Sequence, residues 1–284
     1  MKKRFAKVYL EITNQCNLCC SFCHGTKRAP RTLTVGEFRT LAEKLVPFTD
    51  YLYLHVLGEP LLHPALPEIL DVAAALGLRI CITTNGTLLG ARGELLLAHA
   101  AQLGKVSVSL HSAEANGIPV LSYLDEVLDF AARLGAQGVP SVLRLWNLGE
   151  KGENTENDAI LAHLEQKFPK PWQENRRGTT LAPSVYLEWG ERFDWPDLAA
   201  EDHGEIGTCY GLRDQIAVLS DGSVVPCCLD SEGDITLGNL FDQELADILA
   251  ALRTMAIAEG FRRRRAVEPL CRRCGYARRF AAKE

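Results

Sequence analysis

Residues 16–23 have the sequence Cys-Asn-Leu-Cys-Cys-Ser-Phe-Cys and follow directly after an apolar stretch, 6–13, that is expected to be a β-strand. Cys16, Cys20 and Cys23 have the spacing C-x3-C-x2-C. Thiolates are the usual ligands of iron–sulfur clusters, and four of them normally complete a 4Fe-4S cluster. Three ligands on one short loop therefore predict a cluster with one open iron, which is typical of a catalytic rather than a structural metal site.

Cys19 gives this loop a second interpretation. Cys16-x2-Cys19 followed at once by Cys20-x2-Cys23 also fits a zinc site with four thiolates. The eight residues alone do not decide between an iron–sulfur cluster and zinc, so the decision depends on the rest of the chain.

The composition predicts a large globular core. Of the 284 residues 47% are hydrophobic, which suffices for one barrel domain or for one domain with a small appendage. No apolar run reaches the roughly 18 residues of a membrane span. The N-terminus, residues 1–5, is basic but lacks the apolar region of a signal peptide, so we expect a cytoplasmic protein with no membrane partner.

The ten cysteines are clustered along the chain. Four lie in 16–23, three in 209–228 and two in 271–274, while Cys81 stands alone in an apolar stretch. In a chain without an export signal this pattern argues against a disulfide framework and favours two metal centres. Cys81 is expected to be a core residue.

Strand-like and helix-like stretches alternate through the first two thirds of the chain. The expected strands are 6–13, 51–57, 79–84, 105–110, 140–146 and 184–189, and the expected helices are 34–47, 65–76, 91–103, 120–135 and 155–168. Thr34 with Glu37 fits a capping box at the start of the first helix. Such alternation predicts an α/β fold, with a parallel sheet and helices packed outside it. Six strands are too few for a complete eight-unit barrel, so we expect a partial (β/α)6 barrel in residues 1–190.

Glycine and polar residues gather where the expected strands end, which is where ligands bind in parallel sheets. They are Gly58 and Glu59 after the second strand, Thr84 and Asn85 after the third, Ser109 in the fourth, Arg144 in the fifth and Glu188 in the sixth. Arg144 in an apolar strand is either half of a structural ion pair or a planar donor for a carboxylate. Glu188 is either an exposed charge or an acceptor for a substrate hydroxyl or amine.

The character of the sequence changes after residue 190. Residues 191–208 are acidic, contain proline and glycine, and are expected to be a linker. Residues 209–284 contain an expected β-hairpin over 215–225 and a helix near 242–258. They also hold four thiolates that fit either a zinc or an iron–sulfur site: Cys209, Cys227, Cys271 and Cys274. Cys228 adjoins Cys227 and is an alternative ligand.

The motifs at the strand ends, taken in order, resemble those of the radical S-adenosylmethionine (AdoMet) superfamily, as does the loop with its aromatic Phe22. The resemblance implies that Cys16, Cys20 and Cys23 hold a 4Fe-4S cluster whose open iron takes the amino and carboxylate groups of AdoMet. It further implies AdoMet contacts for Phe22 and for the strand-end residues Gly58, Glu59, Thr84, Asn85, Ser109 and Arg144, with Glu59 receiving the amino group. The zinc interpretation explains only the first of these motifs.

The C-terminal segment resembles the cysteine-rich SPASM extension of these enzymes in its shortened form, Twitch. This resemblance implies a second, auxiliary 4Fe-4S cluster for electron transfer, held by Cys209, Cys227, Cys271 and Cys274. It favours a dehydrogenase-type oxidation, with Arg144, Glu188 and Cys228 as candidate catalytic residues. If the Cys228 thiol returns a hydrogen atom to the substrate, epimerisation results instead. A lyase acting on a modified base, a radical enzyme that modifies ribosomal peptides or RNA, and a non-enzymatic electron carrier are the other hypotheses.

The expected partners follow from the same resemblance. They are a small-molecule or peptide substrate and a reductant of the flavodoxin or ferredoxin type. The net charge of −5 gives no general nucleic-acid signature, but residues 261–284 carry eight Arg and one Lys against two Glu. This basic tail is either a solvated face or a patch for a polyanionic partner, and nucleic acid is expected only there.

Overall fold

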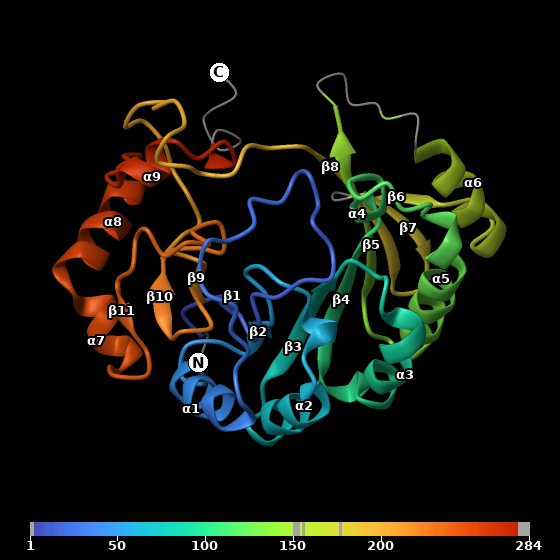
Figure 1. The fold of residues 1–284 in the computed structure, drawn as a ribbon, viewed down its shortest axis with the longest axis horizontal. Coiled ribbons are helices and arrows are strands. Elements are labelled where there is room, and N and C mark those ends of the chain that lie inside the picture. Colours follow the sequence, from blue (N-terminus) through green and yellow to red (C-terminus); the bar gives the residue numbers. More distant parts are fainter. Residues whose placement is uncertain (1–2, 150–153, 155–156, 176–177, 278–284) are drawn as a thin grey trace.

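The computed structural model describes residues 3–149, 154, 157–175 and 178–277 (Figure 1). The centre of its sheet consists of β1 (Lys7–Leu10), β2 (Tyr51–Tyr53), β3 (Arg79–Thr84), β4 (Leu103–Ser109), β5 (Ser141–Leu148) and β8 (Val185–Glu191). These six strands lie side by side in sequence order and are all parallel. Each overlaps a strand expected from the sequence, and the prediction of a partial (β/α)6 barrel is confirmed.

Helices cover the outer face of this curved sheet (Figure 1). They are α1 (Val35–Leu45), α2 (Leu66–Ala75), α3 (Leu89–Ala98), α5 (Leu121–Ala136) and α6 (Asn157–Lys167), each overlapping a predicted helix. Short helical turns η1 (Pro60–Leu62), η2 (Ala100–Gln102) and α4 (His111–Glu114) lie between them. The capping box is confirmed: Glu37 N donates to Thr34 Oγ1 at 3.2 Å, and Thr34 N donates to Glu37 Oε2 at 2.8 Å. Among the described residues, no helix is both long and apolar enough for a membrane crossing.

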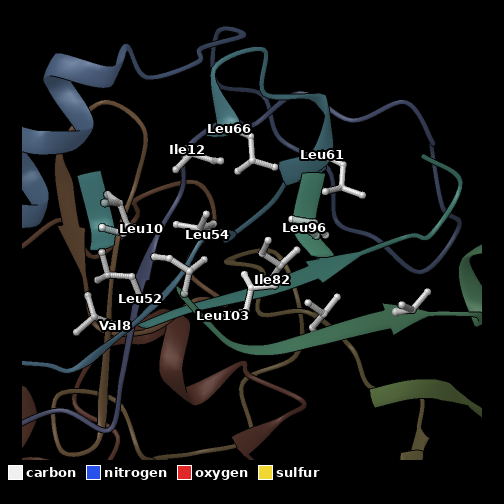
Figure 2. Close-up of a cluster of buried hydrophobic side chains, with 14 of the residues drawn as sticks. Val8, Leu10, Ile12, Leu52, Leu54, Leu61, Leu66, Ile82, Leu96 and Leu103 are labelled. Atoms are coloured by element: carbon white, nitrogen blue, oxygen red, sulfur yellow. The ribbon is translucent and has the colours of Figure 1, made fainter. Parts of the chain in front are cut away.

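Apolar side chains at alternate strand positions pack beneath the helices and form the core (Figure 2). Its fully buried members include Val8, Leu10, Leu52 and Leu103 from the strands, Leu54 directly after β2, and Leu66 and Leu96 from the helices. Successive side chains of a strand point to opposite faces. Tyr9 and Tyr53 therefore face the inside of the barrel, and a register shift after Leu103 brings Lys105 to that face as well. Cys81 is 3% exposed, which confirms that it is a core residue.

A polar hairpin extends one edge of the sheet and was not expected from the sequence. Strand β7 (Gly178–Ala182) pairs antiparallel with β8, and β6 (Gln173–Asn175) pairs antiparallel with β7. All three residues of β6 are exposed, so this strand lacks the apolar alternation by which strands are recognised.

The C-terminal part of the chain extends the other edge. Strand β9 (Gln215–Val218) pairs in parallel with β1, β10 (Ser223–Val225) pairs antiparallel with β9, and β11 (Gly238–Asn239) pairs antiparallel with β10. This confirms the predicted hairpin, whose turn residue Gly222 has a φ of +86°. The single helix expected near 242–258 is wrong: Ala251, with a ψ of 144°, separates α7 (Leu245–Ala250) from α8 (Leu252–Arg262). A short α9 (Pro269–Arg272) follows.

Candidate active site

A cavity of about 530 Å³ lies at the carboxyl ends of the parallel strands. Its lining joins the cysteine loop to the ends of β2, β3 and β4. All but one of the residues expected to hold the first cluster or AdoMet take part: Cys16, Cys20, Cys23, Phe22, Gly58, Glu59, Thr84, Asn85 and Ser109. The exception is Arg144. Residues from four separate stretches of sequence thus converge on one site, as the strand-end argument predicted.

Each of the three expected ligand sulfurs accepts a hydrogen bond from a nitrogen. Leu18 N donates to Cys16 Sγ and Gly25 N to Cys23 Sγ, both at 3.5 Å. Burial, and to a smaller extent the neighbouring thiols, raise the pKa values of Cys16 and Cys23. Hydrogen bonds to the sulfurs are one means by which a protein adjusts the potential of a cluster. The loop therefore offers three thiols in an environment suited to a cluster.

Asn116 was not identified from the sequence, although it contacts this loop twice. Its Nδ2 donates to Cys20 Sγ at 3.1 Å and to Ser112 O at 2.7 Å. Its Oδ1 accepts from the backbone N of Cys19 at 3.0 Å. Asn116 thus ties the loop to the segment that follows β4. The only sequence signal is an Asn-Gly pair, which indicates a turn and gives no indication of what the side chain binds.

Gly58 and Glu59 are placed by the local backbone. Gly58 has a φ of +77°, and a Cβ there would lie 2.2 Å from Thr13 O, so only glycine fits. Glu59 is 2% exposed. Its carboxylate accepts from Leu61 N at 3.0 Å and from Asn85 N at 2.8 Å, while burial raises its pKa. The carboxylate is therefore held in place at the cavity wall by two backbone donors.

Aromatic residues close the cavity on the side of the loop. The Phe22 ring lies 4.8 Å from that of His111 between centroids. Trp195 lines the same cavity and donates from Nε1 to Phe22 O at 3.0 Å. Trp195 lies in the segment expected to be a linker, so its position beside the cluster loop was not predicted.

Arg144 and Glu188 are neighbours across β5 and β8. Arg144 Nε lies 3.6 Å from Glu188 Oε2, and the two side chains are 13% and 18% exposed. The guanidinium also lies 4.7 Å from the ring centroid of Trp146. The ion pair that the sequence allowed is therefore formed. Arg144 Nε is nevertheless buried without a hydrogen-bond partner.

Glu11 is a second important residue that the sequence did not reveal. It is fully buried directly after β1 and accepts from Arg28 at 2.8 and 2.7 Å. The backbone N–H groups of Leu57, at 3.3 Å, and Ser220, at 3.0 Å, donate to the same carboxylate. Glu11 thus connects the cysteine loop, the end of β2 and the C-terminal hairpin.

A second cavity, of about 520 Å³, contains the remaining expected ligands. Cys209, Cys227, Cys271 and Cys274 all line it. Burial raises the pKa of each thiol, and the four are close enough to influence one another electrostatically. Among the described residues, no three Cys, His, Asp or Glu side chains are arranged to hold a single metal ion, here or at the first site.

Cys228 faces away from this second cavity and does not line it. It packs instead against the small cluster that contains Tyr9, Val56 and Val225. Burial raises the pKa of Cys228 to about 11. This placement favours Cys227 over Cys228 as the fourth ligand.

Most arginines in the described part of the basic tail are ion-paired. Arg262 and Arg263 pair with Glu259, Arg265 with Glu205, and Arg272 and Arg273 with Asp202. A third cavity, of about 340 Å³, is lined by Arg4, Arg213, Arg262 and Arg264 together with Cys209. Residues 278–284 of the tail lie outside the described residues.

A partial barrel whose loop carries a C-x3-C-x2-C motif over the carboxyl end, extended by a second group of four cysteines, defines a class of iron–sulfur enzymes. Residues 10–160 match the radical SAM superfamily, and residues 209–275 match SPASM, an iron–sulfur cluster-binding domain. The chain belongs to the radical SAM superfamily. Its cofactors are accordingly a 4Fe-4S cluster with AdoMet and an auxiliary iron–sulfur centre, and the two cysteine-lined cavities fit them.

Individual relatives differ in the reactions for which they are named. The chain is 32% identical to a probable GTP 3′,8-cyclase of Methanocella arvoryzae over 294 residues, covering 91% of this chain and 92% of that one. It is 30% identical to a PqqA peptide cyclase of Xanthomonas oryzae over 195 residues, covering 65% of this chain and 49% of the other. The crystal structure of BtrN in complex with AdoMet and 2-DOIA has a similar fold, with a TM-score of 0.60, 18% identity and coverage of 96% and 94%.

Proposed function

We propose that this protein cleaves AdoMet reductively and uses the resulting 5′-deoxyadenosyl radical to abstract a hydrogen atom from a bound substrate. The observation that supports this most directly is the 530 Å³ cavity, in which Cys16, Cys20 and Cys23, with Cys19 also in the lining, lie opposite the polar ends of three parallel strands. When bound, the cluster would supply the single electron that the reductive cleavage of AdoMet requires.

The chain's own residues then have distinct roles. Cys16, Cys20 and Cys23 hold the cluster, and Cys19 does not. Glu59, fixed by two backbone donors, receives the AdoMet ammonium group through a charge-assisted hydrogen bond. The nearby Thr84, Asn85 and Ser109 supply further polar contacts to the carboxylate and ribose, and Phe22 covers them from the loop.

The second cavity supports an electron-transfer role for the C-terminal cysteines. Cys209, Cys227, Cys271 and Cys274 supply four thiolates, so an auxiliary 4Fe-4S cluster would have no iron left for substrate. Accepting one electron from a substrate radical would complete a two-electron oxidation, and we therefore favour a dehydrogenase-type reaction. Four cysteines are enough ligands for one cluster, so we propose the shortened Twitch form with a single auxiliary cluster.

Other outcomes of the same radical step are alternatives. Epimerisation requires a hydrogen-atom donor, and Cys228 lies inside the barrel beside Tyr9. The relatives named as GTP and peptide cyclases support cyclisation of a small molecule or a peptide to the same degree. A lyase or an RNA-modifying enzyme has less support, because most tail arginines are already paired with acidic residues.

An acidic redox protein of the flavodoxin or ferredoxin type is the electron partner that we propose. Its support is the cavity beside Cys209, which is lined by Arg4 and Arg264 together with Arg213 and Arg262, the last two of which pair with Asp214 and Glu259. Complementary charge speeds such encounters and makes them sensitive to salt. The proposed division of the chain is 1–190 for the barrel, 191–208 for the linker and 209–284 for the auxiliary domain. A cytoplasmic location agrees with ten cysteines that are all unpaired.

The test is anaerobic incubation of the reconstituted protein with AdoMet and dithionite, followed by measurement of 5′-deoxyadenosine. Cys16→Ala, Cys20→Ala and Cys23→Ala should each abolish the product. Cys19→Ala, in the same loop, is the matched control and should retain it. No product from the wild-type protein with a full complement of iron would refute the proposal, and an inactive Cys19→Ala with an active Cys20→Ala would refute the ligand assignment.

A further inference from the structure

Positive charge exceeds negative charge on the inner face of the barrel. Burial, followed by the charges of Arg144, Lys105 and Lys7, lowers the pKa of His55 to about 3. Burial and the charge of Arg144 lower the pKa of Lys105 to about 8. The carboxylate that acts on this group of cations is Glu188. Lys105, Arg144 and the more exposed Lys7 thus act on one carboxylate within this group, which leaves an excess of positive charge there.

Two tyrosines bring the ammonium groups together. Lys7 Nζ and Lys105 Nζ lie 5.9 and 5.7 Å from the ring centroid of Tyr53. The Tyr9 ring lies 5.0 Å from that of Tyr53 and 5.4 Å from that of His55. These side chains come from β1, β2 and β4, or from directly after β2, and so they form one group inside the barrel.

Two nitrogens in this group are buried without a hydrogen-bond partner, His55 Nδ1 and Arg144 Nε. An unsatisfied buried polar atom is costly, and a buried cation is more so unless it is paired. The 3.6 Å between Arg144 Nε and Glu188 Oε2 exceeds an ordinary hydrogen bond. An anionic oxygen group would accept a hydrogen bond from Arg144 Nε, and from His55 in the tautomer that carries its proton on Nδ1.

This group of cations adjoins the cavity that we assign to AdoMet. His55 and Thr83 line that cavity, and Arg144 Nη1 donates to Thr83 Oγ1 at 3.5 Å. A molecule bound beside AdoMet would therefore have its inner end close to the cations.

We propose that the substrate carries an anionic oxygen group, a carboxylate or a phosphate, which binds inside the barrel between Lys105 and Arg144 with His55 beside it. This inference rests on the proposed function, because it assigns the anion to the substrate of that reaction. The carboxylate of AdoMet is the competing source of negative charge. The two sources are separated by working with AdoMet already bound.

The test uses the reconstituted holoenzyme saturated with AdoMet, at constant ionic strength. Inorganic phosphate and acetate are titrated separately, and their binding is followed by calorimetry and by the thermal midpoint. The wild type should bind at least one of them saturably. Lys105→Met should weaken that binding about ten- to a hundred-fold, as expected for the loss of a charge-assisted hydrogen bond. Lys105→Arg should retain binding.

Two further variants keep the result interpretable. Lys7→Met changes an exposed side chain of the same group, so it should fold normally and also bind the anion more weakly. Lys167→Met, on α6 next to Asp129, is the matched control and should bind like the wild type. Normal binding by both Lys105→Met and Lys7→Met would overturn the inference, as would anion binding that occurs only when AdoMet is absent.

Formation of 5′-deoxyadenosine without substrate is measured in parallel. It should persist in Lys167→Met, because Lys167 lies outside both proposed binding sites. A wild-type protein that binds phosphate but forms no 5′-deoxyadenosine would refute the proposed function and leave the anion site standing. Active cleavage without saturable binding of either anion would refute the anion site alone.

Discussion

Replacing Glu11 by Gln is expected to destabilise the protein strongly, because its buried carboxylate connects three segments of the chain. It accepts two hydrogen bonds from Arg28, at 2.8 and 2.7 Å, and one each from Leu57 N and Ser220 N, at 3.3 and 3.0 Å. Gln has the same size, but it lacks the charge and places an NH2 group where all the neighbours are donors.

The expected magnitude follows from the burial of this pair. Glu11 is fully buried and the Arg28 side chain is 14% exposed. Removing one partner of a buried ion pair costs about 3–5 kcal/mol, because the other charge is left unpaired. A chain of this size loses about 2–4 °C of thermal midpoint per kcal/mol, so the midpoint should fall by roughly 6–20 °C.

The assay is thermal unfolding of the anaerobically purified holoprotein, followed by far-ultraviolet circular dichroism. Glu94→Gln is the matched control, since Glu94 forms a two-point contact with Arg133 on the exposed surface. Solvent screens that pair, so its loss should change the midpoint far less. Equal decreases in the two variants would show that the Glu11 pair contributes no more than a surface ion pair.

The remaining predictions concern the two cysteine sites and their neighbours. Reconstituted wild type should contain about eight irons, the sum of two 4Fe-4S clusters. Cys227→Ala should contain about four and Cys228→Ala about eight; the reverse result would exchange their roles. Glu59→Gln should weaken AdoMet binding about ten- to a hundred-fold by calorimetry with normal iron content, from the loss of one charge-assisted hydrogen bond. Unchanged binding would exclude Glu59 as the ammonium acceptor. Arg144→Lys keeps the charge and loses the planar fork. Weaker AdoMet binding would assign Arg144 to the cofactor, whereas normal AdoMet binding with weaker binding of the anionic probe would assign it to the substrate. Asn116→Leu should alter the reduction potential of the first cluster, because it removes the donor to Cys20 Sγ; an unchanged potential would limit Asn116 to fixing the loop.

The sequence predicted the barrel because its strands and helices depend on local patterns. Apolar runs bounded by turns indicated all six parallel strands, and the rule that ligands bind at their carboxyl ends then grouped Glu59, Asn85 and Ser109 into one site. The same reasoning missed β6, whose exposed polar residues show no apolar alternation. The sequence-based prediction joined α7 to α8 because the apolar spacing continues across Ala251. The break is visible only in the backbone, where Ala251 has an extended ψ of 144°.

Side chains whose roles depend on distant parts of the chain could not be predicted. Asn116 binds a sulfur that is 96 residues away in the sequence, and Glu11 accepts from Ser220, which is 209 residues away. An acidic residue inside the apolar run of 6–13 was the one available signal for Glu11, since a buried charge requires a partner. That partner is Arg28, 17 residues further along the chain, whereas the contact with Ser220 depends on β9 lying beside β1.

The parallel pairing of β9 with β1 also determines how the two cysteine sites are related. Just after β10, where the chain turns, Cys227 lines the auxiliary cavity while Cys228 packs against Tyr9 inside the barrel. A single step along the backbone therefore separates the expected cluster ligand from the space in which we place the substrate. An electron that leaves a substrate radical in that space would reach the auxiliary centre through this short segment. The same arrangement places the Cys228 thiol on the side of the proposed substrate. Electron transfer past Cys227 and hydrogen-atom return from Cys228 would therefore use neighbouring residues just after β10.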